Sequence, residues 1–369
     1  MKTNKVRCKV VMVNKWIMAV LLLFVVQHGK AQYYSFASDG GGMASDVAEF
    51  LANWMSYLPD NRQLSRISIP GTHDTMAINI GGPNVATQSM SLETQLQSGV
   101  RYLDIRLRCQ KDSFPVHHDL VWLGVYFDDV MNTVTRFLAS HPRETVFMKI
   151  QDEYTKDPVA CKDGDHMYDD IWYNSGYLRE FLKKFDRWKG WFSAVGSPRW
   201  PTVGDSGYLP VMGDVRGRVV LLRGKGLGQF QLGYWWPGGT YAWSDDMEVQ
   251  DSYQMYVTSA SIDSKRRDIY YYFKYNAYDR ENSPRYDGRI VRTQRIGVNA
   301  LNGSGGGYPF TFASGKLFTY QNPTFDGMNT YFGEIVAWEL EAGRRPYLGI
   351  VPADYPSVEL IHKIVRTNF

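Results

Sequence analysis

The chain has 369 residues, a formal net charge of +3 and a hydrophobic fraction of 44%. A charge this close to neutral gives no support to nucleic-acid binding, which normally needs a strongly basic surface. The length suits one large α/β barrel or two ordinary domains.

Residues 1–32 are typical of a secretory signal peptide. The apolar run 16–26 is too short to span a bilayer comfortably, and a small-residue exit follows near Ala31. Basic residues precede the run: Lys2, Lys5, Arg7, Lys9 and Lys15. We therefore expect residues 33–369 to form the mature protein, secreted or periplasmic, with an uncleaved N-terminal anchor as the alternative. Whether Cys109 and Cys161 pair there is left open by the sequence.

Short apolar runs that end in polar residues recur through the rest of the chain, without an internal repeat or linker. The candidate strands are Arg66–Ile69, Arg101–Arg106, Pro115–His118, Val146–Ile150, Val219–Arg223, Glu248–Asp251, Arg295–Asn299 and Tyr347–Val351. Helical patterns occur at Leu92–Ser98, Phe127–Ala139, Leu178–Phe185 and Val358–Val365. Eight strands interleaved with helices predict a single-domain α/β fold, an irregular (β/α)8 barrel of the TIM type.

Potential acids, bases and cations gather at the C-terminal ends of these runs. Active sites of such barrels form on that face from several strands, so we expect the site there. The residues at or just past the strand ends are His73, Asp104, Arg106, His118, Gln151, Arg223, Asp251, Asn299 and Asp354.

Three motifs make the prediction more specific: 67–74 (ISIPGTHD), 99–108 (GVRYLDIRLR) and the pair His117-His118. Weaker echoes follow at 213–222, 249–253 and 354–355. In this order the sequence resembles the bacterial phosphatidylinositol-specific phospholipase C family, of the X-domain type. The resemblance implies cleavage of phosphatidylinositol to diacylglycerol and inositol 1,2-cyclic phosphate, with no metal or other cofactor.

The resemblance also implies a role for each central residue. His73 matches the general base for the inositol 2-hydroxyl, and Asp354 matches the carboxylate that orients it. Arg106 would bind the phosphate oxygens with its planar fork. His118 matches the general acid for the leaving glycerol oxygen. Asp74 and Asp104 match the carboxylates that support this acid and hold the arginine.

For the headgroup, Asp251 and Tyr253 match inositol contacts, and Arg223 is a candidate second cation. Gln151 stands where the family can place a Lys near the headgroup, and Asp119 stands where a Gly commonly follows the histidine pair. Only one of the adjacent His117 and His118 can face a site on one side of a strand. We choose His118 from the family match and expect His117 to pack or support the site.

Alternatives remain for the site and for the function. Asp104 and Arg106 also fit a plain structural ion pair, and the His and Asp residues suit zinc or calcium, although a fixed guanidinium would repel a divalent ion. Another headgroup, such as a glycosylphosphatidylinositol anchor, or a non-catalytic binding module for inositol lipids or glycans are the rival functions. We expect transient membrane contact through an aromatic rim, with these candidates: the loop 303–312, Phe318, Tyr320, Trp235, Trp236 and Trp243.

Overall fold

A computed structural model describes residues 45–108, 113–153, 185–195, 210–225, 227, 233–244, 246–279, 295–316 and 324–369. The chain divides into Met1–Gly41, which lies outside these residues, and Gly42–Phe369, which contains all of the described residues. The predicted signal peptide and both Cys109 and Cys161 therefore fall outside the described part. Among the described residues, no helix is long and apolar enough to cross a membrane.

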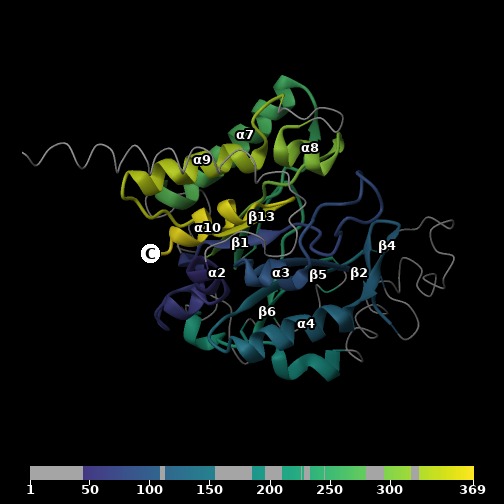
Figure 1. Cartoon of the computed structure of the whole chain (residues 1–369), viewed down its shortest axis with the longest axis vertical. Coiled ribbons are helices and arrows are strands. Elements are labelled where there is room, and N and C mark those ends of the chain that lie inside the picture. The colour runs from purple at the N-terminus through teal and green to yellow at the C-terminus, as the bar shows by residue number, and fades with distance from the viewer. Residues whose placement is uncertain are drawn as a thin grey trace, which may run out of the picture. The chain divides into compact units, whose positions relative to one another are not determined.

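A curled, mostly parallel sheet forms the centre of this unit (Figure 1). Its neighbours run in the order β7-β6-β5-β2-β1-β13-β11-β9-β8. In chain order the strands are β1 Ile69–Thr72, β2 Tyr102–Leu107, β5 Val146–Asp152, β6 Val219–Arg223, β7 Tyr234–Trp235, β8 Tyr241–Trp243, β9 Met247–Gln250, β11 Ile296–Asn299 and β13 Ile350–Ala353.

The described part of the sheet contains eight strands that run parallel, from β7 to β9, and β8 is antiparallel at the edge. Helices pack beside them: α2 Ser45–Ala52, α3 Leu92–Gln97, α4 Phe127–Ser140, α7 Ser259–Lys274, α9 Met328–Glu341 and α10 Val358–Arg366. The parallel strands with their covering helices make an irregular (β/α)8 barrel, which confirms the predicted fold class.

One predicted barrel strand is wrong. Pro115–His118 does form a strand, β3, but it pairs antiparallel with β2 and with β4 (Val121–Tyr126) as a hairpin beside the barrel. Only residues 108–114 separate β2 from β3, and a parallel crossover needs a dozen or more residues. The remaining barrel strand is instead β7, whose two residues are too few to show a period in the sequence.

Two other predicted strands begin too early. Residues Leu64–Arg66 form a short 3-10 helix, and β1 begins only at Ile69. The strand expected at Tyr347–Val351 is likewise displaced toward the C-terminus, and its pairing of Ile350 with Ile69 explains why both move together. Because the two strands are hydrogen-bonded neighbours, their bounds are set by each other and not by local apolar runs.

The expected helices lie close to their predicted bounds where the structure describes them. The Ser91 hydroxyl accepts a hydrogen bond from the Thr94 backbone N–H at 3.1 Å and so caps α3. In α4, Val130, Val134 and Leu138 are all buried, as their helical spacing predicts. Of the predicted Leu178–Phe185 helix, only Phe185 belongs to the described residues.

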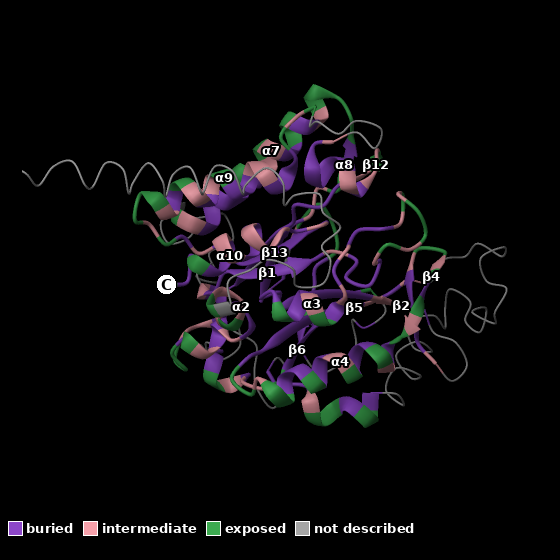
Figure 2. Cartoon of the chain, in the orientation of Figure 1, coloured by how far each residue is buried: buried purple, intermediate pink, exposed green. Residues whose placement is uncertain are grey.

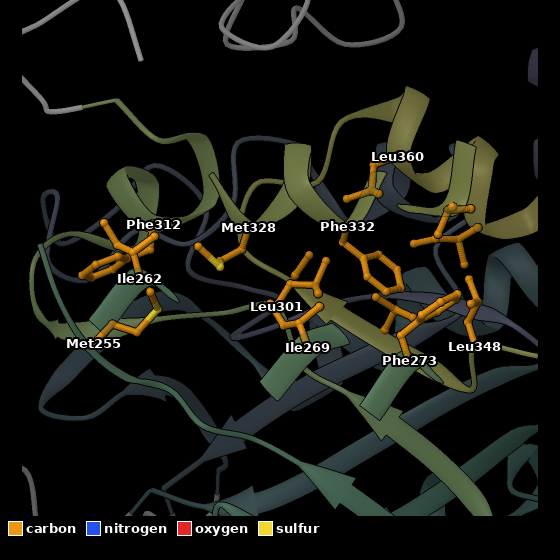
Figure 3. Packing of buried hydrophobic residues seen from close by; sticks show 14 residues of the cluster. Met255, Ile262, Ile269, Phe273, Leu301, Phe312, Met328, Phe332, Leu348 and Leu360 are labelled. Carbon is orange, nitrogen blue, oxygen red and sulfur yellow. The ribbon is translucent and has the colours of Figure 1, made fainter. Parts of the chain in front are cut away.

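A large hydrophobic cluster lies between the C-terminal helices and the sheet (Figure 3). Ile269 of α7, Phe332 and Val336 of α9 are fully buried in it. Burial is concentrated in the strands and on the inward helix faces, with exposed residues on the outer faces (Figure 2). This packing gives the strand ends a rigid base, because well-packed interiors hold side chains in defined positions.

A buried ion pair ties the opposite, N-terminal end of the sheet. Arg101, just before β2, lies 2.9 Å from the Glu144 carboxylate, which precedes β5, and both side chains are almost fully buried. Glu144 also accepts hydrogen bonds from the backbone N–H groups of Met55 and Ser56. The pair therefore joins two strands to the segment that follows α2.

Elements beyond the C-terminal strand ends complete the fold. The short strands β10 (Gln254–Tyr256) and β12 (Ser304–Gly306) form a separate two-stranded parallel sheet. The loop 303–312, a candidate for the aromatic rim, therefore contains β12 and the start of α8 (Pro309–Ser314). Phe318 and Tyr320 lie outside the described residues.

Candidate active site

His73 and Asp74 form a tight turn at the C-terminal end of β1. Asp74 adopts a left-handed backbone conformation with φ of 41°, which is uncommon for a residue with a side chain. Side chains from the following loop hold the turn: Gln88 donates to the His73 carbonyl at 2.7 Å and Thr87 to the Asp74 carbonyl at 2.9 Å. Such strain is typical of sites where a side chain must be presented in one direction.

Asp354 binds the far side of the His73 ring. Its Oδ1 lies 2.8 Å from Nδ1 of His73, and its Oδ2 accepts a hydrogen bond from the backbone N–H of Gly303 at 3.3 Å. Burial lowers the pKa of His73, but the Asp74 and Asp354 carboxylates outweigh this effect and raise it to about 9. The imidazole is thus held by carboxylates on two sides.

Arg106 occupies the centre of the cluster. Its guanidinium lies 2.6 Å from Asp74 Oδ1, 3.1 Å from Asp104 Oδ2 and 3.3 Å from Glu153 Oε1. Its NH2 group is 2.8 Å from Nε2 of His73, so it donates a hydrogen bond there when Nε2 carries no proton. Burial opposes ionisation of Asp104, yet the Arg106 and Lys149 cations hold the pKa of this carboxyl well below its usual range.

His118 faces the same cluster from β3. Its Nδ1 lies 2.7 Å from the carbonyl oxygen of Val85, and its Nε2 lies 3.5 Å from Asp74 Oδ2. His117 points to the other side of the strand and is buried, and burial followed by the Arg108 charge lowers its pKa to about 4. The structure therefore brings His118, and not His117, to the cluster.

The backbone conformation of Asp119, in the turn after His118, explains why a Gly is common at this position. Its backbone is left-handed, with φ of 50°, a conformation that Gly adopts freely and Asp tolerates. Two contacts hold this turn: the Asp119 N–H donates to Glu153 at 3.0 Å, and Arg108 donates to the Asp119 carbonyl at 2.8 Å. The departure from Gly is therefore accommodated with the turn intact.

The donor atoms of His73, Asp74 and Asp104 all lie within 4.8 Å of one another, which is close enough for three ligands of one metal ion. All three side chains, however, contact the Arg106 guanidinium. A permanent cation at the centre of the donor set suits an anionic group and disfavours a divalent ion. Independence from metal stays a prediction.

Comparison with known proteins finds a matching domain family and similar curated proteins. The profile of the phosphatidylinositol-specific phospholipase C X domain matches residues 62–181. The 1-phosphatidylinositol phosphodiesterase of Listeria monocytogenes is 34% identical over 175 residues, which cover 46% of this chain and 47% of that protein. The enzyme of the same name from Staphylococcus aureus strain Newman is 27% identical over 250 residues, or 60% of this chain and 74% of that protein.

Both comparisons support a bacterial phosphatidylinositol-specific phospholipase C family for this chain. Its match spans about half the length of the Listeria relative and about three quarters of the Staphylococcus relative. The fold agrees as well. The solved Listeria phosphatidylinositol-specific phospholipase C superposes with a TM-score of 0.62 at 24% identity, covering 86% of this chain and 99% of that one.

The candidate headgroup residues follow β9 at the same end of the barrel. Asp251 accepts a hydrogen bond from Asn302 at 3.3 Å, and the Tyr253 ring is 45% exposed. Asn302 is followed by Gly303, whose N–H donates to Asp354. One dipeptide thus links the candidate headgroup carboxylate to the carboxylate behind His73, a connection that sequence reasoning missed.

Gln151 and Arg223 are placed differently from each other. Gln151 pairs with Arg106 across β5 and β2 and donates to Glu153 at 3.1 Å, so it lies within the site. Arg223 pairs with Ile150, and side chains alternate along a strand, so Arg223 points to the opposite sheet face from Gln151. The structure does not bring Arg223 into the cluster.

Two charged residues of the cluster were missed from the sequence, Lys149 and Glu153. Both lie on the same face of the β5 segment as Gln151, and each contacts the Asp104–Arg106 pair. A signal for Lys149 was present, because a lysine inside an apolar strand of an α/β protein must find a partner. The alternation from Gln151 would have identified Glu153.

Proposed function

We propose that the protein is a phosphatidylinositol-specific phospholipase C, a lyase-type phosphodiesterase that releases diacylglycerol and inositol 1,2-cyclic phosphate without a metal. One observation carries the proposal. The Asp74 Oδ2 atom lies 3.4 Å from Nε2 of His73 and 3.5 Å from Nε2 of His118, with Arg106 in contact with Asp74. Two imidazoles and a fixed cation around one small space provide a base, an acid and an anion-binding group.

His73 would act as the general base. Asp354 accepts a hydrogen bond from Nδ1–H, so the neutral form of the ring, which is populated as the pH approaches its pKa of about 9, presents the Nε2 lone pair to the cluster. When a substrate phosphate binds Arg106, Nε2 becomes available to the inositol 2-hydroxyl. The hydroxyl oxygen attacks phosphorus as His73 takes its proton, and Asp354 stabilises the imidazolium that forms.

Arg106 would bind the non-bridging phosphate oxygens. Its guanidinium is held by carboxylates from β1, β2 and β5, so little reorganisation is needed when the diester arrives. A preorganised cation in a partly buried site stabilises the charge that develops on these oxygens in the transition state. The three anchors also explain why an arginine is suited here, since its planar fork satisfies several acceptors at once.

His118 would act as the general acid. The Val85 carbonyl can only accept, so Nδ1 of His118 carries a proton. A second proton on Nε2, directed toward Asp74, makes the ring an imidazolium that can donate. As the bond between phosphorus and the glycerol oxygen breaks, this proton passes to the leaving oxygen.

Headgroup and membrane recognition belong to the same proposal. Asp251 would accept inositol hydroxyls, Tyr253 would lie against the sugar, and Gln151 would border the pocket. Exposed rings of Tyr253, Trp235 and Tyr256 support a transient aromatic contact with the lipid surface. Trp236, an expected rim residue, is instead buried.

The export pattern at residues 1–32 supports secretion or a periplasmic location for the enzyme.

The test is turnover of phosphatidylinositol in mixed micelles with excess EDTA, followed by phosphorus NMR. The wild type should release cyclic inositol phosphate, and His73→Ala and His118→Ala should not. His141→Ala is the matched control, since its ring stacks on Phe137 of α4 at 4.3 Å and it belongs to no part of the cluster. No release by the wild type, with or without added calcium, would reject the proposal and favour a glycosylated anchor or a binding module.

A further inference from the structure

Neither Gln151 nor the candidate second cation Arg223 supplies a positive charge beside Arg106. Position 151 is a neutral Gln, and Arg223 points to the other sheet face. With no charge from these two positions, an anionic diester would meet the Arg106 guanidinium surrounded by carboxylates. A further cation contacts a carboxylate side chain of the cluster, and it lies one level below Gln151 on the same face of β5.

Lys149 is this cation. Its Nζ lies 3.1 Å from Asp104 Oδ1, and its side chain is 7% exposed. The ammonium also lies 4.9 Å from the centre of the Trp236 ring, which stacks on Tyr102 at 5.7 Å. Asp104 thus carries Lys149 on one oxygen and Arg106 on the other. A lysine confined between a carboxylate and an aromatic face has little freedom to move.

We propose that Lys149 is a positioning residue of the active site: through Asp104 it fixes the orientation of Arg106, and it supplies the second positive charge that an anionic diester needs. This inference rests on the proposed function. The resemblance would place the second charge at position 151, beside the headgroup. In this chain Lys149 would supply it from one level lower on β5, through the Asp104 carboxylate.

Charge balance supports this role. The charged groups around His73 are four carboxylates and two nearby cations: Asp74, Asp104, Glu153 and Asp354, with Arg106 and Lys149. Farther out, the buried Lys265 ammonium interacts with Asp354 and Asp251. His118 adds a titratable ring across Asp74. Without Lys149, Asp104 would be neutralised by Arg106 alone, and the extra negative charge would repel phosphate and favour protonated His73.

The experiment compares Lys149→Met and Lys149→Gln with the wild type and with Lys189→Met. Lys189 is an exposed lysine paired with Asp186 and serves as the control for loss of one positive charge. Two quantities are measured: the His73 pKa by NMR, and the affinity for inositol 1,2-cyclic phosphate. The His73 pKa can be measured without turnover, so it tests this inference separately from the proposed function. The proposed function is rejected if the wild type is inactive.

Both Lys149 variants should raise the pKa of His73 by about one pH unit and weaken inositol cyclic phosphate binding about 10-fold or more. Their rate profiles should move to higher pH by the same amount, whereas Lys189→Met should match the wild type. A lysine that merely packs against Trp236 would lower thermal stability and leave the pKa of His73 and the affinity unchanged. That result would overturn the inference. If one Lys149 variant is too unstable to measure, the other decides, and a His73 pKa equal to that of the wild type in that variant would also overturn it.

Discussion

Nδ1 of His73 and Oδ1 of Asp354 lie 2.8 Å apart, although 281 positions separate the two residues in the chain. Each directly follows a strand, and β1 and β13 are parallel neighbours from Ile69↔Ile350 to Thr72↔Ala353. The next residue on each strand therefore reaches the same level at the barrel mouth. The proposed catalytic pair therefore needs no local signal in the sequence, since the sheet itself brings the two strand ends together.

Asp354→Asn tests this pair. The substitution keeps the side-chain shape but removes a charge that raises the pKa of His73, so that pKa should fall and turnover should drop about 10³- to 10⁴-fold. NMR titration and a phosphatidylinositol assay measure the two effects. Asp263→Asn, at an exposed position of α7, should change neither. An unchanged His73 titration in Asp354→Asn would contradict the assigned role.

His118→Ala tests the general acid. Cleavage of phosphatidylinositol should fall about 10²- to 10⁴-fold, because the glycerol oxygen needs a proton as it leaves. An inositol phosphodiester with a p-nitrophenyl leaving group needs none, so its cleavage should be far less affected. His73→Ala should impair both substrates equally. Equal losses on both substrates in His118→Ala would argue against the acid role.

The pH dependence of stability tests the electrostatics of His73. Its folded pKa of about 9 lies above the ordinary 6.5, so its stabilising contribution is complete below pH 6.5 and is lost as the pH rises through 9. The free energy of unfolding, measured with denaturant between pH 6 and 9.5, should fall by up to about 3 kcal/mol from this group. His73→Gln should abolish that part of the slope, and His141→Gln should retain it. A slope common to both variants would place the effect elsewhere.

Glu144→Ala tests the ion pair at the other end of the barrel. The change leaves the buried Arg101 charge unpaired, so the protein should lose about 3 to 5 kcal/mol of unfolding free energy. Glu93 pairs with Arg136 at the surface, with about two thirds of each side chain exposed, and Glu93→Ala should cost less than about 1 kcal/mol. The pH dependence of phosphatidylinositol cleavage by the folded fraction of Glu144→Ala should match that of the wild type. A shifted profile would mean that this end of the barrel reaches the site.

Asp251→Asn tests the headgroup contact. Loss of the charged acceptor should raise KM for phosphatidylinositol about 10- to 100-fold, with a smaller effect on thermal stability. Asn302→Ala removes the donor that holds Asp251 at 3.3 Å and should give a smaller rise in KM. Asp326→Asn, an exposed change, is the control. An unchanged KM in Asp251→Asn would move inositol recognition to other residues.

The sequence by itself determined the barrel class and the central groups of the site. His73 with Asp74, Asp104 with Arg106, and His118 all occur in short sequence motifs. Residues two apart on a strand share a face, and residues at neighbouring strand ends share an edge, so the motifs predict that these side chains lie close together. Local capping and helical spacing likewise predicted α3, α4 and α10 within a few residues. These features depend on neighbours in the chain, which a sequence displays directly.

Only the tertiary structure decided which strands pair and which face each residue takes. Pro115–His118 reads like a barrel strand, but the connection to β2 is too short for a parallel crossover, and the pairing is antiparallel. Arg223 lies at the expected strand end, yet its register with Ile150 directs it away from the site. A shift of one residue reverses the face of a side chain, and register is set by contacts between distant segments. For the same reason Lys149 became a site residue only when β5 placed it beside Asp104, since a sequence specifies that a buried charge needs a partner but not which partner it meets.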